Sequence, residues 1–316
     1  MAAFSPPPFP EVGRGTLREI SRRHNLAAVA TEPLPEVGVF NRIYPVGDYL
    51  VLRVPRNGPA FVAAALKERV AVPAARAAGV RTPTMVAFDD ARDLLPVPYS
   101  ILERVPGETL GLLDIDPARA TEAWRELGRD LALLHSNVPE NGPATNLQPE
   151  AMPDPRPWPE EMAEEGYFTS TEAGWFSEWL DRLAPAALAP ARRRFLHGDS
   201  QATNVIVEAD SLRYLCVLDW GNSGWGDPAW DFAGVPLRVV PFMLESYREV
   251  AVPDGEETLE ARILWRHVQL SLYLLRRDPQ PGRSWAERPF GMLLDVVRFF
   301  LDGHGERWSR WAPPGA

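Results

Sequence analysis

The first third of the chain alternates short apolar runs with polar turns, a pattern typical of an antiparallel sheet. An amphipathic pattern over residues 13–26 precedes it and predicts a first helix. Residues 37–54 predict a β-hairpin, whose turn uses the freedom of Gly47 at positive φ. Two more strands are expected at 84–88 and 99–104, on either side of an acidic turn.

Helical patterns dominate the rest of the chain. An alanine-rich helix is expected at 61–78, where Pro73 would break or kink it. Further helices are expected at 119–135, 175–183, 231–250 (interrupted by Pro236 and Pro241), 257–277 and 289–301. Strands followed by helices predict an α+β fold of two lobes. We expect a small antiparallel-sheet lobe with the N-terminal helix at residues 1–105, and a larger, mainly helical lobe at residues 106–316.

A second short hairpin carries the chemistry. Two apolar runs, Val205 to Val207 and Cys216 to Leu218, are separated by a polar turn. If the first residue of one run pairs with the last residue of the other, Asn204 lies directly opposite Asp219, at a Cα distance of about 5 Å. Carboxylate and amide oxygens at that distance suit Mg²⁺, a hard cation that prefers oxygen ligands.

Asp199 lies just before this hairpin, five residues before Asn204. That is the spacing of a kinase catalytic loop, in which an aspartate orients the attacking hydroxyl and an asparagine holds metal. Taken singly, Asp199, Asn204 and Asp219 are also typical of loops and strand ends. Together around one hairpin they predict phosphoryl transfer from a magnesium-bound nucleotide.

The sheet lobe supplies candidates for nucleotide binding. Arg53 is the only basic residue inside the second predicted strand, and Glu68 on the following helix is its expected partner. Taken alone, this arginine is more typical of a strand residue whose charged end reaches into solvent. The backbone groups of Glu103 and Val105 would face an adenine edge. The turn that ends at Asn41 would cover the phosphates, although it has only one glycine.

Composition narrows the choice of partners. The net charge of −10, from 43 acidic and 33 basic residues, argues against nucleic acid, whose binding depends on lysine and arginine. It is compatible with a cationic substrate, or it only aids solubility. The single cysteine excludes disulfides within the chain and favours a reducing compartment. Because neither a secretory signal nor a membrane-length apolar run is present, we expect a cytoplasmic protein without an obligate protein partner.

The stretch 150–172 holds seven acidic residues against one basic residue. It would either face a cationic acceptor or form a solvated surface loop, and the second interpretation is the simpler one.

Three motifs point to one family: His197-Gly-Asp199-x-x-x-x-Asn204, Leu218-Asp219-Trp220 and Gly226-Asp227-Pro228-x-x-Asp231. In these motifs, and more loosely from about Val37 to Leu274, the chain resembles the aminoglycoside phosphotransferase and choline kinase family. The resemblance implies a protein-kinase-like fold, Mg²⁺ as cofactor, ATP or GTP as donor, and a hydroxyl of a small molecule as acceptor.

The same resemblance implies roles for single residues. Asp199 is similar to the catalytic base, Asn204 and Asp219 to the metal ligands, and Arg53 with Glu68 to the pair that positions phosphate. Asp227 and Asp231 are expected to begin and brace a helix, because aspartate satisfies free N–H groups at a helix N-terminus. Both are also candidates for binding the acceptor. His197 and His135 are expected to be structural hydrogen-bonding residues.

The acceptor is the most open part of the hypothesis. An aminoglycoside-like antibiotic is the first choice; a macrolide, a peptide antibiotic, a choline-like amine or a sugar are alternatives. Arg53 resembles some macrolide kinases, whereas Asn204 differs from the histidine that many of them carry. A protein kinase is disfavoured because Leu218-Asp219-Trp220 stands where Asp-Phe-Gly would. A nucleotide-binding pseudokinase is the non-enzymatic alternative.

Overall fold

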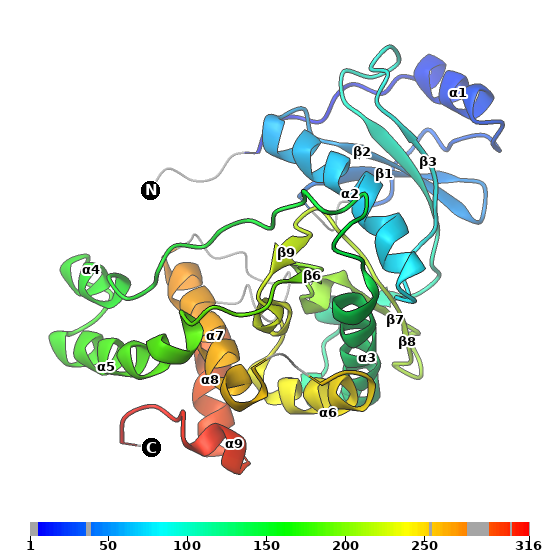
Figure 1. Cartoon of the computed structure of the whole chain (residues 1–316). Coiled ribbons are helices and arrows are strands. Elements are labelled where there is room, and N and C mark those ends of the chain that lie inside the picture. The colour runs from blue at the N-terminus through cyan, green and yellow to red at the C-terminus, as the bar shows by residue number, and fades with distance from the viewer. Residues whose placement is uncertain (1–5, 36–38, 253–254, 277–290, 304, 316) are drawn as a thin grey trace.

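The computed structural model describes the chain except for residues 1–5, 36–38, 253–254, 277–290, 304 and 316. Its N-terminal lobe is built on a four-stranded antiparallel sheet in the order β1-β2-β4-β3 (Figure 1). The strands are β1 (Asn41–Val46), β2 (Leu50–Pro55), β3 (Met85–Asp89) and β4 (Tyr99–Glu103). The predicted hairpin and the two later strands are confirmed, and Gly47 has the expected positive φ of 57°.

Helix α1 (Arg14–Arg23) covers this sheet with its apolar side. Leu17 and Ile20 are buried with sheet residues such as Leu52 and Ile101 in one cluster. The amphipathic pattern therefore predicted both the helix and the face that it buries.

Helix α2 (Pro59–Ala77) runs through Pro73 without ending there, so the expected break is wrong. Proline removes one helical hydrogen bond, but the residues around it are held by packing. Ala71, Val72 and Ala75 are buried in the core of the C-terminal lobe. Their burial outweighs the local cost, and it ties the second half of α2 to the other lobe.

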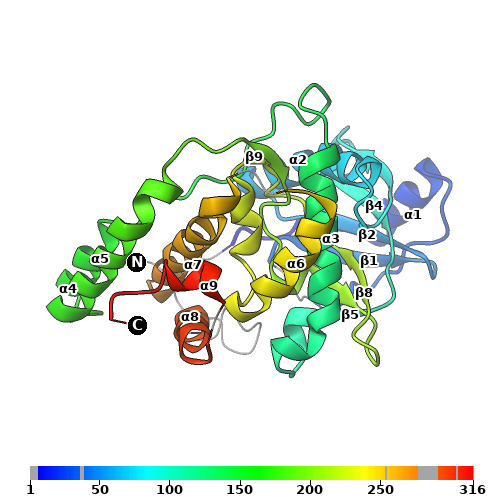
Figure 2. The same cartoon turned by 60° about the horizontal axis from the view of Figure 1, so that its bottom comes forward.

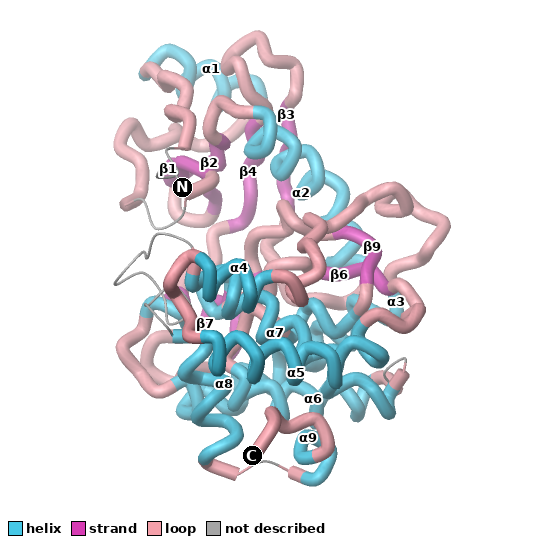
Figure 3. The backbone as a smooth tube through the Cα atoms, turned by 90° about the vertical axis from the view of Figure 1, so that its left-hand side faces the viewer, coloured by secondary structure: helices cyan, strands magenta, loops and turns pink. Residues whose placement is uncertain are grey.

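The C-terminal lobe is mainly helical. It contains α3 (Thr121–Asn137), α4 (Trp158–Glu164), α5 (Ser170–Ala187), α6 (Val240–Val250), α7 (Leu259–Leu275), α8 (Gly291–Leu301) and α9 (Glu306–Ser309). Figure 3 shows the first sheet at one end of the molecule and most of these helices at the other. The predicted α+β class is confirmed. The boundary at residues 105 and 106 stays a prediction.

The helix expected over 231–250 is instead three shorter pieces. Two 3-10 turns, Pro228–Phe232 and Leu237–Val239, precede α6. Pro241 lies in the first turn of α6, where its missing N–H leaves no helical bond unmade. This proline starts a helix rather than interrupting one.

Helices α3 and α6 lie side by side (Figure 2). A Cβ atom at Gly128 of α3 would lie 2.2 Å from the backbone oxygen of Met243 in α6. Only glycine permits this approach of the two helices.

Two small sheets cross the C-terminal lobe near the boundary with the first. One contains β5 (Glu108–Thr109), β7 (Val205–Val207) and β8 (Tyr214–Val217) in the order β5-β7-β8. The other pairs β6 (Arg194–Leu196) with β9 (Gly224–Gly226). The loops after β6 and β8 carry the candidate catalytic residues.

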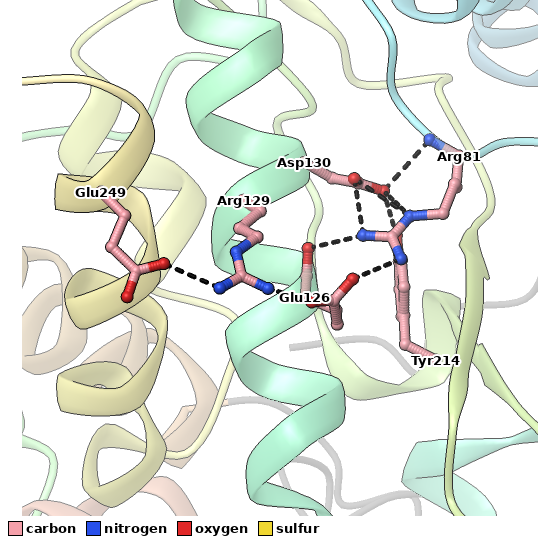
Figure 4. A network of polar contacts seen from close by, with 6 residues as sticks. All are labelled: Arg81, Glu126, Arg129, Asp130, Tyr214 and Glu249. Carbon is pink, nitrogen blue, oxygen red and sulfur yellow. Dashed lines mark hydrogen bonds and ion pairs between the residues drawn. The ribbon is translucent and has the colours of Figure 1, made fainter.

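Arg81, in the connection between α2 and β3, joins the two lobes (Figure 4). Its guanidinium binds Asp130 of α3 at 2.8 Å and Glu126 of the same helix at 2.6 Å. Tyr214 of β8 donates to Asp130 at 2.9 Å. Burial raises the pKa of Asp130 above its usual value, and the hydrogen bonds from Arg81 oppose that effect. Arg81 is therefore the charged partner that the buried carboxylate of Asp130 requires.

Across the described residues, no helix combines the length and the apolar character that a membrane crossing requires.

Candidate active site

The loop after β6 has a backbone shape that requires glycine. Gly198 has a φ of 81°, and a Cβ atom there would lie 2.2 Å from the backbone oxygen of Asn222. The carbonyl oxygen of Gly198 accepts hydrogen bonds from the side chains of Asn222 at 2.8 Å and Trp230 at 3.0 Å. The loop is thus fixed on both sides just before Asp199.

The buried side chain of Asp231 holds the same loop through hydrogen bonds to its backbone. Its carboxylate accepts the backbone N–H groups of His197 at 2.8 Å and Gly198 at 2.7 Å. It also accepts a hydrogen bond from His135 at 3.0 Å. Asp231 is 0% exposed, which leaves no surface for an acceptor. The interpretation of Asp231 as a substrate-binding residue is therefore corrected: it holds the loop.

His197 is a structural residue of this loop. Its Nε2 donates to the carbonyl oxygen of Leu218 at 2.9 Å, so its Nδ1 is free to accept the N–H of Asp199 at 3.2 Å. Burial lowers the pKa of His197, which keeps the ring neutral in this arrangement.

The Asp199 carboxylate is held by two side-chain amides. Asn204 donates to Oδ2 of Asp199 at 3.0 Å, and Gln201 donates to the same oxygen at 3.2 Å. Burial, reinforced by the charge of Asp219, raises the pKa of Asp199 to about 7. The sequence analysis did not single out Gln201, although its place between Asp199 and Asn204 in the motif was a usable signal.

The predicted pairing of the second hairpin is wrong by one residue. Val205 pairs with Val217 rather than with Leu218, and the strands contain an irregularity after Ile206. Asn204 consequently lies opposite Leu218, whose N–H donates to the Asn204 carbonyl at 2.8 Å. Asp219 lies beyond the strand with a φ of 64°, a left-handed conformation that a strand pattern does not predict.

Arg53 and Glu68 form the expected pair. Nη1 of Arg53 lies 3.1 and 3.0 Å from the two carboxylate oxygens of Glu68. Burial raises the pKa of Glu68, Arg53 opposes this and the neighbouring Asp219 reinforces it, with a net value of about 7. Two carboxylates from opposite lobes therefore share one arginine.

This donor set fits a divalent cation. The Nδ2 group of Asn204 is bound to Asp199, and no described donor binds its Oδ1. Asp219 is half-buried beside Glu68 and Asp199, and both burial and the charge of Asp219 raise the pKa of each of those carboxyls, an effect that a cation between them would oppose. Within the part of the chain that the structure describes, no cluster of three His, Cys, Asp or Glu side chains could hold a metal by itself. Asn204 and Asp219 therefore remain the candidate ligands of a site that water or phosphate oxygens would have to complete.

The remaining candidates occupy less specific positions. Glu103 accepts hydrogen bonds from Thr84 through its side chain. No described acceptor binds the N–H of Val105, which is half-buried at the end of the sheet lobe. Asn41 is half-buried at the start of β1. The earlier part of its predicted turn, residues 36–38, lies outside the described residues.

Asp227 is engaged within the protein. It caps the 3-10 turn that follows by accepting the N–H of Ala229 at 3.0 Å. It also forms an ion pair with Arg262 of α7. These contacts satisfy the role expected for an aspartate that begins a helical turn.

Comparison with known proteins gives matches in sequence to a family and to curated proteins. The model of a family described as "Phosphotransferase enzyme family" matches residues 34–255. The chain is also 28% identical to viomycin phosphotransferase from Streptomyces vinaceus over 164 residues. That alignment covers 50% of this chain and 56% of the relative, so the chain spans little more than half the length of this curated relative.

Solved structures share the fold. The GDP complex of aminoglycoside 2'-phosphotransferase-IIIa superposes with a TM-score of 0.62 at 16% identity, over 88% of this chain and 96% of that one. A macrolide 2'-phosphotransferase from Brachybacterium faecium gives 0.56 at 23% identity, over 87% and 97%. A choline/ethanolamine kinase family protein from Mesorhizobium loti gives 0.57 at 18% identity, over 94% and 96%. These likenesses confirm the predicted two-lobed, protein-kinase-like fold.

Proposed function

Because this chain belongs to the phosphotransferase enzyme family, as its motifs predicted, we propose that it transfers the γ-phosphoryl group of ATP or GTP to a hydroxyl of a small molecule. One observation carries the proposal. Asp199, held by Asn204, lies beside Asp219, and Asp219 lies beside the Arg53–Glu68 pair of the other lobe. A base, a metal site and a phosphate-binding cation thus meet where the lobes face each other.

Mg²⁺ at Asn204 and Asp219 would neutralise charge on the nucleotide phosphates. Asp199 orients the acceptor hydroxyl and takes its proton. Because the Asp199 carboxylate is pinned by two amides, it is held ready in one direction. Arg53, braced by Glu68, positions the phosphates, and the backbone groups of Glu103 and Val105 bind the adenine edge.

The acceptor we place first is an aminoglycoside-like antibiotic, followed by a macrolide, a peptide antibiotic such as viomycin, a choline-like amine and a sugar. The similarity to an aminoglycoside phosphotransferase, a macrolide phosphotransferase, viomycin phosphotransferase and a choline/ethanolamine kinase family protein supports these classes, apart from the sugar. We expect the enzyme to act in the cytoplasm, where its nucleotide donors are made.

The acidic stretch 150–172 gives weaker support for a cationic acceptor than its composition suggested. Glu161 and Glu165 bind Arg276 of α7, and Asp154 binds Arg156. Glu172 closes a capping box at the start of α5. Most of these carboxylates therefore already have partners within the protein.

An assay of Asp199→Asn tests the function. Nucleoside diphosphate release is measured with each acceptor class in the presence of Mg²⁺, and nucleotide binding is measured separately by calorimetry. We expect turnover to fall by at least about 10²-fold, the usual contribution of a general base, with nucleotide affinity nearly unchanged.

Asp210→Asn, in the exposed turn after β7, is the matched control and should retain full activity. Unchanged turnover of Asp199→Asn at saturation would remove the assigned role. Nucleotide binding without transfer to any acceptor by the unaltered protein would favour a pseudokinase.

A further inference from the structure

Arg266 lies on the face of α7 that approaches the catalytic loop. Its guanidinium carbon stacks over the ring of Trp230 at 5.1 Å from the ring centre. The indole N–H of Trp230 donates to the carbonyl oxygen of Gly198 at 3.0 Å. Only one aromatic ring therefore separates the cation from the residue that precedes Asp199.

The neighbouring arginines have anionic partners, whereas Arg266 has none among the residues that the structure describes. Arg262, one turn earlier on α7, binds Asp227, and Arg276 binds Glu161 and Glu165. The one hydrogen bond of Arg266 is to the neutral Oε1 of Gln269, at 2.9 Å. No carboxylate of the described residues lies within ion-pair distance of it.

The shortage of negative charge is costly at this position. Arg266 is largely enclosed, and burial lowers its pKa below the usual value for arginine. Asp227 attracts it from a distance, but Arg262 repels it and holds that aspartate. Buried charges in proteins are normally paired, and removal of a partner from a buried pair costs several kcal/mol. Because Arg266 is largely enclosed and has no carboxylate partner among the described residues, we infer that a ligand supplies the negative charge.

Arg266 and its neighbours lie on the helical lobe, beside the catalytic loop, where we expect the acceptor to bind. Gln269 donates to the carbonyl oxygen of Pro153 at 2.6 Å, so α7 borders the segment that follows Glu150. The N–H of Glu150 binds Asn222, which also binds Gly198. The nucleotide-binding candidates Arg53 and Glu68, in contrast, lie on the other lobe.

We propose that Arg266 binds an anionic group of the acceptor, a carboxylate or a sulfate or phosphate ester, while Asp199 acts on its hydroxyl. This inference rests on the proposed function and narrows its acceptor. The planar fork of arginine matches such groups with two hydrogen bonds. An acceptor that carries only amines does not supply this partner, so the anion site changes the order of acceptors proposed above and places acidic or zwitterionic hydroxyl compounds before aminoglycosides.

Matched pairs of probes test the inference. Glucuronate, gluconate and 3-hydroxybutyrate are each compared with the neutral amide, together with every acceptor found in the antibiotic panel. In the unaltered protein we expect the acid of a pair to have the lower KM. In Arg266→Gln the KM for the acid rises about tenfold to a hundredfold, the usual effect of losing a charged hydrogen bond. The KM for the amide and for the nucleotide, and kcat, stay within about twofold of the original values.

Reversing the charge at position 266 should create a new preference among acceptors, which a general loss of stability would not produce. Arg266→Glu should lose the preference for the acid and accept aminoglycosides with a lower KM than the unaltered protein. The matched control is Arg125→Gln, since Arg125 also stacks on an aromatic ring, Phe242 at 5.4 Å, but binds Glu245 far from the loop. It should leave all KM values unchanged.

Two outcomes overturn the inference. An equal fall in kcat for acids and amides, with KM unchanged, would mean that Arg266 contacts the transferred phosphoryl group instead. A thermal-shift titration, which needs no turnover, provides the second. Glucuronate should stabilise the unaltered protein more than Arg266→Gln, and equal stabilisation of the two would remove the anion site. If glucuronate binds through Arg266 but no acceptor is phosphorylated, the proposed function fails while the anion site stands.

Discussion

His267 shows how burial of one side chain makes stability depend on pH. It is almost fully buried in α7, and its Nε2 donates to the carbonyl oxygen of Phe232 at 2.7 Å. Burial lowers the pKa of His267 to about 4. In the unfolded chain a histidine takes up its proton near pH 6.5. Protonation therefore favours the unfolded chain throughout this interval.

The free energy of unfolding should accordingly be highest above about pH 6.5 and fall as the pH drops towards 4. At pH 5 the loss through His267 should be about 2 kcal/mol. His267→Gln removes the titration. At pH 7 it should be less stable by about 1–2 kcal/mol, and the gap should close by pH 5. Urea unfolding at both pH values measures this, and a gap of constant size would contradict the assigned role of the histidine.

The candidate catalytic residues show how much of a site can be recognised from single positions in a sequence. Asp199, Asn204 and Asp219 stand out in the sequence because oxygen-bearing side chains at this spacing have a chemical use. The positions of Asp231 and Trp230 under the loop depend on packing between segments more than thirty residues apart. Local patterns do not contain that information.

At the scale of elements, the approach of α3 to α6 is set by one missing side chain. Gly128→Ala would force a Cβ atom to within 2.2 Å of the Met243 carbonyl oxygen. Backbone is unable to move aside as a flexible side chain does, so we expect a loss of about 1–3 kcal/mol in the free energy of unfolding.

Gly174→Ala provides the opposite expectation in the same experiment. This glycine is exposed within α5, and no atom lies within 4 Å of its Cβ position. Alanine should stabilise the protein by about 0.5–1 kcal/mol, since glycine loses more conformational entropy in a helix. Equal effects of the two substitutions would show that contact with α6 is irrelevant.

Elements follow from the sequence better than their exact limits do. Periodicity located α1, the first hairpin and most of the later helices, because one apolar face defines each of them. It failed at Pro73, where tertiary burial maintained a helix that local propensity would end. It also failed at the second hairpin, where Val205 pairs with Val217 and an irregularity follows Ile206, because an apolar run does not specify the register in which it pairs.

At the scale of the whole molecule, Arg81 supplies the ion pairs that attach the connection after α2 to the helical lobe. Arg81→Gln would leave Asp130, whose side chain is 3% exposed, with Tyr214 as its main partner. Loss of one member of a buried pair costs about 3–5 kcal/mol, and we expect a value near the lower limit because Arg81 itself is partly exposed.

Arg129→Gln is the control from the same network (Figure 4). Arg129 binds Glu126 and Glu249 at the surface, where ion pairs contribute about 0–1 kcal/mol. Thermal unfolding of both variants in low and high salt separates the two cases. A similar small loss for Arg81→Gln would mean that the lobes are joined by apolar packing alone.

The attachment at Arg81 also limits how the interlobe space can widen. The chain itself links the lobes near Val105, Arg81 joins them again through α3 and β8, and the second half of α2, just before Arg81 in the chain, is buried in the helical lobe as well. Rotation about the line through these attachments strains them least, whereas twisting and sliding would disturb each of them. Substrates would then enter and leave as the lobes open about this one axis. Loss of the Arg81 contacts would allow the lobes to move relative to each other in other directions as well.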